Sequence, residues 1–125
     1  MKLLIVDDST MLRDMLSYAL NEGGYNDVTE AIDGIDGLEK AKKDIFDLVI
    51  TDVNMPNMDG LTLVTELRKL DQYIKTPILV LTTERGDDMK SKGKAAGATG
   101  WIVKPFVPDQ LLKAVNIVLD KNKNI

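Results

Sequence analysis

The sequence contains neither cysteine nor histidine, and these two absences exclude several kinds of chemistry. Without cysteine the chain has no disulfide framework, no thiolate metal site and no thiol nucleophile. Without histidine it has no Ser-His-Asp triad, no imidazole ligand for a metal ion and no phosphohistidine of its own. A reaction that passes through a phosphohistidine therefore needs a second protein to carry that residue.

The chain also lacks an apolar run long enough to cross a membrane. Its apolar start is cut by Asp7 and Asp8 well before it reaches the length of a signal-peptide core. A formal net charge of -4 argues against nucleic acid as a direct partner, because phosphate binding needs a basic face. We therefore expect a cytoplasmic protein with no membrane or nucleic-acid partner, organised as one domain over residues 1–125.

What is present is a regular alternation of short apolar runs and amphipathic segments. The runs predict strands, which cover residues 3–6, 27–31, 45–52, 78–82 and 100–104. The segments predict helices. The first begins after Ser9 or Thr10 and stops at Gly23-Gly24, the second starts at Asp33-Gly34, and the others cover residues 60–70, 84–97 and 109–120. In the second helix Ile35, Leu38 and Ala41 are expected to face inward. The strand over 27–31 is the most polar, which suits the edge of a sheet.

This alternation predicts an α/β fold, with a doubly wound five-stranded parallel sheet and helices on both faces. In such sheets ligands bind at the carboxyl ends of the strands, where the strand order reverses. Chemically active side chains stand at the ends of four separate predicted strands. They are Asp7 with Asp8, Asp52, Thr82 and Lys104. We therefore expect these side chains to form one site.

Three carboxylates in one crevice repel each other unless a cation neutralises them. Ligands that are all oxygen select a hard ion, and Mg²⁺ fits because it takes few carboxylates and often binds with phosphate. One carboxylate would then be the nucleophile that forms an acyl phosphate. Asp52 is the candidate because it alone stands at the exit of the central apolar strand. Lys104 would pair with the carboxylate or the phosphoryl oxygens, and the Thr82 hydroxyl would donate to the phosphoryl group.

Four blocks of the sequence resemble the signature blocks of the response-regulator receiver domain, in the right order and across essentially the whole chain. They are Ile5–Asp8, Thr51–Gly60, Leu81–Glu84 and Val103–Phe106. The resemblance implies the flavodoxin-like strand order 2-1-3-4-5. It also implies that Asp52 is phosphorylated by a sensor histidine kinase, with Thr82 and Lys104 contacting the phosphoryl group. Mg²⁺ would be held by Asp7, Asp8, Asp52 and the backbone carbonyl of Asn54, and the bond before Pro105 would be cis.

The resemblance further implies a switch. Phosphorylation would draw the Thr82 hydroxyl toward the site, and Trp101 would then turn inward and reshape a partner-binding face. Most relatives carry Tyr or Phe where this chain has Trp101, so a larger ring must pivot here. The face would include six residues: Arg85, Gly86, Trp101, Val103, Phe106 and Val107. Asn54, Thr83 and Glu84 occupy positions that tune the lifetime of the phosphoryl group in this family.

Within that family the chain is most similar to single-domain chemotaxis regulators, which have no output domain. This implies a monomeric signalling protein, rather than an enzyme with a substrate, that binds a flagellar motor switch protein, with a phosphatase as a further partner. A phosphorelay shuttle is the nearest alternative. An FMN-binding flavodoxin is disfavoured, because Asp7 and Asp8 would repel phosphate. A phosphatase with an aspartate nucleophile usually has a second aspartate two residues on, where this chain has Asn54.

Overall fold

Strands and helices alternate along the chain as the sequence predicts. The computed structural model describes residues 1–83 and 86–123. The strands are β1 (Lys2–Val6), β2 (Asp27–Ala31), β3 (Leu48–Asp52), β4 (Ile78–Thr82) and β5 (Gly100–Val103). The α-helices are α1 (Thr10–Glu22), α2 (Gly34–Lys43), α3 (Gly60–Arg68), α4 (Asp87–Ala96) and α5 (Pro108–Lys123), and a 3-10 helix η1 (Asp71–Tyr73) follows α3.

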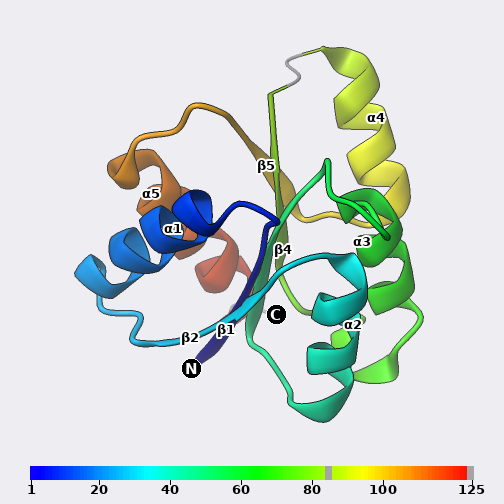
Figure 1. Ribbon diagram of the computed structural model, residues 1–125, viewed down its shortest axis with the longest axis horizontal. Helices are drawn as coiled ribbons and strands as arrows, with labels where there is room; N and C mark the ends of the chain where they lie inside the picture. The colour runs from blue at the N-terminus through cyan, green and yellow to red at the C-terminus, as the bar shows by residue number, and fades with distance from the viewer. Residues whose placement is uncertain (84–85, 124–125) are drawn as a thin grey trace.

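The five strands form one parallel sheet in the order β2-β1-β3-β4-β5. This confirms the predicted doubly wound architecture and the edge position of β2. Figure 1 shows α1 and α5 on one face of the sheet and α2, α3 and α4 on the other. Because the chain first moves from β1 to β2 and then crosses to β3, the strand order reverses between β1 and β3. A ligand site is therefore expected at the carboxyl ends of these two strands.

Two hydrophobic cores lie between the sheet and its helices, one on each face of the sheet. Alternate residues of each central strand point into opposite cores, so Leu79 and Leu81 of β4 face α1 and α5 while Val80 faces α2, α3 and α4. Every residue of β3 and β4 is buried. Full burial of one such aliphatic side chain contributes about 1.5–3 kcal/mol, so these strands form a rigid base for whatever stands at their ends.

Strand β3 begins later than predicted, at Leu48 rather than at Ile45. Ile45 is 66% exposed, and the backbone N–H of Phe46 donates to the hydroxyl of the buried Tyr73 rather than to a neighbouring strand. The same hydroxyl lies 2.7 Å from the carbonyl oxygen of Ala41. Tyr73 therefore ties the end of α2 to the entry of β3, a tertiary contact that the local apolar pattern does not reveal.

The prediction that Ile35 faces inward is wrong, since this side chain is 44% exposed. The prediction is confirmed for Ala41, which is buried, and Leu38 packs against the core, but the other buried positions of α2 are Gly34 and Gly37. A Cβ atom at Gly37 would lie only 3.0 Å from a methyl group of Val6 on β1. Small residues thus bring α2 close to the sheet, and that approach rotates Ile35 outward.

The remaining boundaries differ from the predictions by a few residues. Helix α3 ends at Arg68 because the N–H of Leu70 bonds to the carbonyl of Leu67, a tighter turn than an α-helix. Strand β5 ends at Val103, one residue before the predicted Lys104, and α5 continues to Lys123, beyond the predicted end at residue 120. In the described part of the chain, no helix is both long enough and apolar enough to span a membrane.

Candidate functional site

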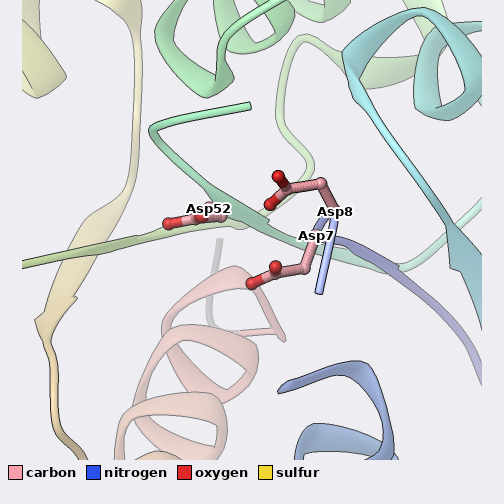
Figure 2. A group of neighbouring side chains, drawn as sticks. All are labelled: Asp7, Asp8 and Asp52. Atoms are coloured by element: carbon pink, nitrogen blue, oxygen red, sulfur yellow. The ribbon is translucent and has the colours of Figure 1, made fainter. Parts of the chain in front are cut away.

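Three carboxylates meet at the carboxyl ends of β1 and β3. Val6 is paired with Thr51 in the sheet, so Asp7 and Asp52, the next residues along each chain, are neighbours. Asp7 and Asp52 are buried at 0% and 6% exposure, whereas Asp8 is exposed. Figure 2 shows the side chains of Asp7 and Asp8 extending from the end of β1 beside that of Asp52. This is the crevice predicted from the strand order.

The three carboxylates suit a small hard cation. One oxygen from each lies within 4.8 Å of the others, which is close enough for a common ion. Among the described residues, Asp7 Oδ2 is the one buried side-chain nitrogen or oxygen without a hydrogen-bond partner. Burial raises the pKa of Asp7, and the neighbouring charges of Asp52 and Asp8 raise it further. A divalent ion would both use the unbonded oxygen and offset this repulsion, and oxygen ligands favour Mg²⁺ among the common ions.

Lys104 brings a positive charge to the same crevice. Its Nζ donates to Asp52 Oδ1 at 2.7 Å and lies 3.9 Å from Asp7 Oδ2. The lysine directly follows β5, and its backbone N–H donates to the Thr82 carbonyl at 2.7 Å. The Lys104–Pro105 peptide bond is cis, as the family resemblance implies. The structure therefore brings Asp7, Asp8, Asp52 and Lys104 together from three separate strands.

The main chain at Asp52 is held closely by Gly60. A Cβ atom on Gly60 would lie 2.0 Å from the Asp52 carbonyl oxygen, so only glycine fits at this position. The N–H of Gly60 donates to the carbonyl of Val53 at 2.8 Å, and the N–H of Val53 donates to Asp52 Oδ1 at 2.9 Å. The start of α3 thus fixes both the backbone and the carboxylate of Asp52.

The β3–α3 loop, residues 53–59, is also fastened to the start of α2. Asn57 adopts a left-handed backbone conformation with φ of 68°, which asparagine tolerates better than most residues. Its side-chain amide donates to Asp33 Oδ2 at 2.8 Å. Asp33 caps α2 by accepting from the N–H of Asp36, and these two hydrogen bonds hold the pKa of Asp33 below its ordinary value. Asn54 lies exposed within this loop, beside the carboxylate cluster in sequence.

The residues predicted for the switch lie on β4 and β5. Thr82 is buried at the end of β4, Trp101 is 36% exposed on β5, and Val103 is paired with Thr82. Phe106 is half-buried, while Thr83, Gly86 and Val107 are exposed. The predicted roles of Glu84 and Arg85 lie outside the described residues.

Sequence reasoning missed three residues that hold the site. Gly60 and Asn57 were considered only as members of the Thr51–Gly60 block, although the Asn-Met-Asp-Gly sequence is itself a signal for special backbone conformations. Arg13 was also missed. Its guanidinium donates to the Asp7 carbonyl at 2.6 Å and pairs with Glu30 at 3.1 Å, which ties α1 to the end of β1. This contact joins residues distant in sequence, so no local pattern marks it.

Two shallow apolar grooves lie on the α1 side, and the first of them adjoins the carboxylate site through Lys104. One, of about 260 Å³, is lined by Leu12, Met15, Thr83, Lys104, Pro105 and Phe106. The other, of about 420 Å³, is lined by Asp14, Met15, Tyr18, Phe106 and Pro108. A larger hollow of about 620 Å³ lies around Phe46 and Thr76, near the amino-terminal ends of β3 and β4. It lies away from the carboxylates, so its size does not make it the functional site.

Fold and site together define a doubly wound α/β domain with an acidic, lysine-containing crevice at its topological switch point. Residues 3–116 match the response regulator receiver domain, and the chain belongs to this family. The family consists of signalling domains that accept a phosphoryl group.

Relatives in the family cover nearly the whole chain. The chain is 41% identical to chemotaxis protein CheY1 of Helicobacter pylori over 98% of its own length and 99% of that protein. It is 36% identical to chemotaxis protein CheY-3 of Vibrio cholerae over 97% of its length and 93% of that protein. The solved structure of chemotaxis response regulator CheY4 of Vibrio cholerae is 51% identical and superposes with a TM-score of 0.89, covering 94% of this chain and 97% of that one.

Proposed function

We propose that Asp52 is the phosphoacceptor of a two-component signalling pathway and that a sensor histidine kinase is its donor. The observation that carries this proposal is the geometry around Asp52, a buried carboxylate with a lysine Nζ at 2.7 Å and two further carboxylates beside it. A buried carboxylate cluster of this kind is unfavourable for folding alone, which favours a functional reason for it.

In the proposed reaction a carboxylate oxygen of Asp52 attacks the phosphorus of a phosphohistidine. The new O–P bond forms an acyl phosphate, the P–N bond breaks, and the imidazole of the donor leaves. Lys104 orients the Asp52 carboxylate and then pairs with the phosphoryl oxygens, and the Thr82 hydroxyl donates to the same group. Asp7, Asp8, Asp52 and the Asn54 carbonyl would hold Mg²⁺, which, when bound, neutralises charge that develops during transfer.

The two grooves beside the site offer a place for the donor. The donor must approach Asp52 closely, and the smaller groove contacts the site through Lys104 and Thr83, while the larger one continues from it at Met15 and Phe106. Met15 and Tyr18 of α1 are 48% and 67% exposed and give this surface an apolar character. We propose that the phosphohistidine-bearing helix of the kinase packs here, with its histidine directed at Asp52. Exposed apolar side chains next to a site are typical of a protein–protein interface.

Phosphorylation would be read out at α4 and β5. A phosphoryl group adds a charge of about -1.5 to -2 and three acceptor oxygens, which would attract the Thr82 hydroxyl. Thr82 and Val103 are paired in the sheet, and Trp101 precedes Val103 by two residues on the same face. Movement at Thr82 can therefore reach Trp101 and the proposed partner face, which includes Gly86, Phe106 and Val107.

The lifetime of the phosphoryl group would depend on access of water to Asp52. Thr83 is exposed beside the site, and Asn54 is exposed in the β3–α3 loop, so both can influence that access. We propose that the domain assists its own dephosphorylation and that a separate phosphatase is a further partner. The proposed contribution of Glu84 falls outside the described residues.

The similarity to CheY proteins supports chemotaxis control through a flagellar motor switch protein in the cytoplasm. Action without an output domain and a monomeric state remain predictions. A phosphorelay shuttle is the second candidate. Measuring the affinity for a motor-switch peptide with and without an acyl-phosphate mimic separates the two. An affinity that is the same in both conditions would contradict control of the motor.

Intact mass spectrometry of protein treated with acetyl phosphate tests the phosphoacceptor proposal. We expect one added phosphoryl group when Mg²⁺ is present, none after chelation, and none in Asp52→Asn. Asp59→Asn is the matched control, because Asp59 caps α3 from the same loop and lies outside the carboxylate cluster. Phosphorylation that persists in Asp52→Asn would overturn the assignment.

A further inference from the structure

Lys90 of α4 lies over the ring of Trp101 on β5. Its Nζ is 5.5 Å from the ring centroid, within the distance at which an ammonium group is attracted to the face of an indole. Both side chains are exposed. Among the residues that the structure describes, theirs is the one cation–π contact. The contact joins the one tryptophan of the chain to α4, the helix at which the proposed readout takes place.

The register of the sheet explains why α4 reaches this ring. Trp101 is paired with Val80, which belongs to the core under α2, α3 and α4, whereas the neighbouring Ile102 belongs to the core under α1 and α5. The Trp101 side chain therefore stands on the α4 face of the sheet. Thr82 follows Val80 by two residues and stands on the same face, so the ring lies on the side toward which Thr82 can act.

Helix α4 is held differently at its two ends. At its end, the carbonyl of Gly97 accepts a hydrogen bond from the guanidinium of Arg68 at 2.9 Å. At its start, Gly86 provides no side-chain cap. Lys90 lies in the first half of the helix, between these two ends. Its contact with Trp101 therefore adds to the buried side chain of Met89 in tying this half of α4 to the sheet.

We propose that Lys90 is a positioning residue that holds Trp101 in its outward orientation and so biases the domain toward the unphosphorylated state. The proposal rests on the switch role of Trp101 described under the proposed function. An inward movement of the ring would break the contact with Lys90. At an exposed site a cation–π contact changes an equilibrium by about two- to fivefold, so Lys90 sets the threshold of the switch and leaves the transition possible.

The direction of the effect follows from linkage. A ligand that favours the inward orientation must bind more tightly when the outward orientation loses a stabilising contact. Beryllofluoride, a mimic of the acyl phosphate, should therefore bind more tightly, by about two- to fivefold, when Lys90 loses its charge. If Lys90 acted only through the general electrostatic field, loss of its positive charge would instead weaken binding of this anion. The two explanations thus predict opposite signs.

Four proteins test the proposal: wild type, Lys90→Met, Lys90→Arg and Lys92→Met. Methionine removes the charge at similar length, arginine keeps a cation for the ring, and Lys92→Met removes one charge from the same helix at an exposed position. The first readout is Trp101 fluorescence and its quenching by acrylamide without ligand. The second is the affinity for beryllofluoride in the presence of Mg²⁺, followed by the same fluorescence.

We expect altered fluorescence and quenching together with tighter beryllofluoride binding in Lys90→Met only. Lys90→Arg should restore wild-type behaviour, and Lys92→Met should match wild type. Lys90→Met that matches wild type in quenching and in affinity, or Lys90→Arg that behaves like Lys90→Met, would overturn the proposal. If wild type binds no beryllofluoride, the phosphoacceptor function fails instead, while unchanged quenching in Lys90→Met would still reject the role of Lys90.

Discussion

Gly60 and Gly93 both lie in helices on the same face of the sheet, but their surroundings are very different. At Gly60, the first residue of α3, a Cβ atom would lie 2.0 Å from the carbonyl oxygen of Asp52. At Gly93, inside α4, a Cβ atom would meet no atom within 4 Å. Gly60 is required because the start of α3 contacts the site closely. Gly93 leaves space beside α4, which makes no such contact.

The difference extends to the elements that carry the two glycines. The β3–α3 junction is fixed at Asp52 by Val53 and Gly60 and, through Asn57, by the cap of α2. Helix α4 is tied at its end by Arg68, has no side-chain cap at its start and contains a glycine in its interior. The comparison indicates that the proposed acceptor is held rigidly, while α4, the proposed reporting element, can be moved by a small energy.

The most damaging change should be Gly60→Ala. The added methyl group cannot fit against the Asp52 carbonyl without a shift of backbone, so we expect a loss of about 3–5 kcal/mol in the free energy of unfolding. Mg²⁺ affinity should fall as well in the protein that remains folded, because the shift displaces Asp52. Denaturant unfolding and calorimetric Mg²⁺ titration measure the two effects. A variant with wild-type stability would show that the junction is not rigid.

Arg68→Met removes the clamp at the end of α4. The guanidinium donates to the carbonyl oxygens of Thr76 and Gly97 at 2.7 and 2.9 Å, as well as to those of Tyr73 and Ile74. Because these carbonyls would lose a charged donor, we expect a loss of about 2–3 kcal/mol in denaturant unfolding.

The neighbouring Lys69→Met is the matched control for Arg68→Met. Lys69 is 69% exposed in its side chain and pairs with Glu66 three residues earlier, so its loss should change stability by no more than about 0.5 kcal/mol. Equal effects of the two substitutions would refute the clamp.

Asp33→Asn should change how stability depends on pH. In the folded chain the Asp36 N–H and the Asn57 amide lower the pKa of Asp33, so the ionised carboxylate stabilises the fold at pH values above its unfolded pKa. That contribution is lost as pH falls through the folded pKa. Wild type should therefore exceed Asp33→Asn by about 1 kcal/mol near pH 7, and the gap should close below about pH 4. Urea unfolding at several pH values measures it, and a gap independent of pH would contradict the assignment.

Gly93→Ala should have the smallest effect and the opposite sign. Alanine favours the helix by about 0.5–1 kcal/mol over glycine, and the space beside Gly93 accepts its methyl group. We expect a small gain in thermal stability without a change in phosphorylation by acetyl phosphate. Destabilisation of the size predicted for Gly60→Ala would remove the contrast between the two regions.

The sequence was sufficient for the fold and for the position of the acceptor site. Short apolar runs ending on Asp7, Asp52 and Thr82 determine both where the strands stop and which side chains stand at one edge of the sheet. The strands over 27–31 and 78–82 were predicted to the residue because polar or turn-forming residues mark both of their ends.

Other features depend on contacts that no local pattern records. Ile35 was wrongly placed on the inward face of α2 because hydrophobicity favoured it, while the close approach to Val6 selected glycines. The start of β3 was placed too early because the hydroxyl of Tyr73, distant in sequence, takes the N–H of Phe46. The contact between Lys90 and Trp101 likewise requires α4 to be packed on β5.

Hydrogen exchange measured with and without phosphodonor and Mg²⁺ is the most direct test of the contrast between a fixed acceptor and a movable reporter. In protein shown by mass spectrometry to be phosphorylated, we expect altered exchange in α4 and β5, and little change in α3 from Gly60 onward. Asp52→Asn should show neither change. Exchange in α4 and β5 that stays the same in fully phosphorylated protein would contradict the account.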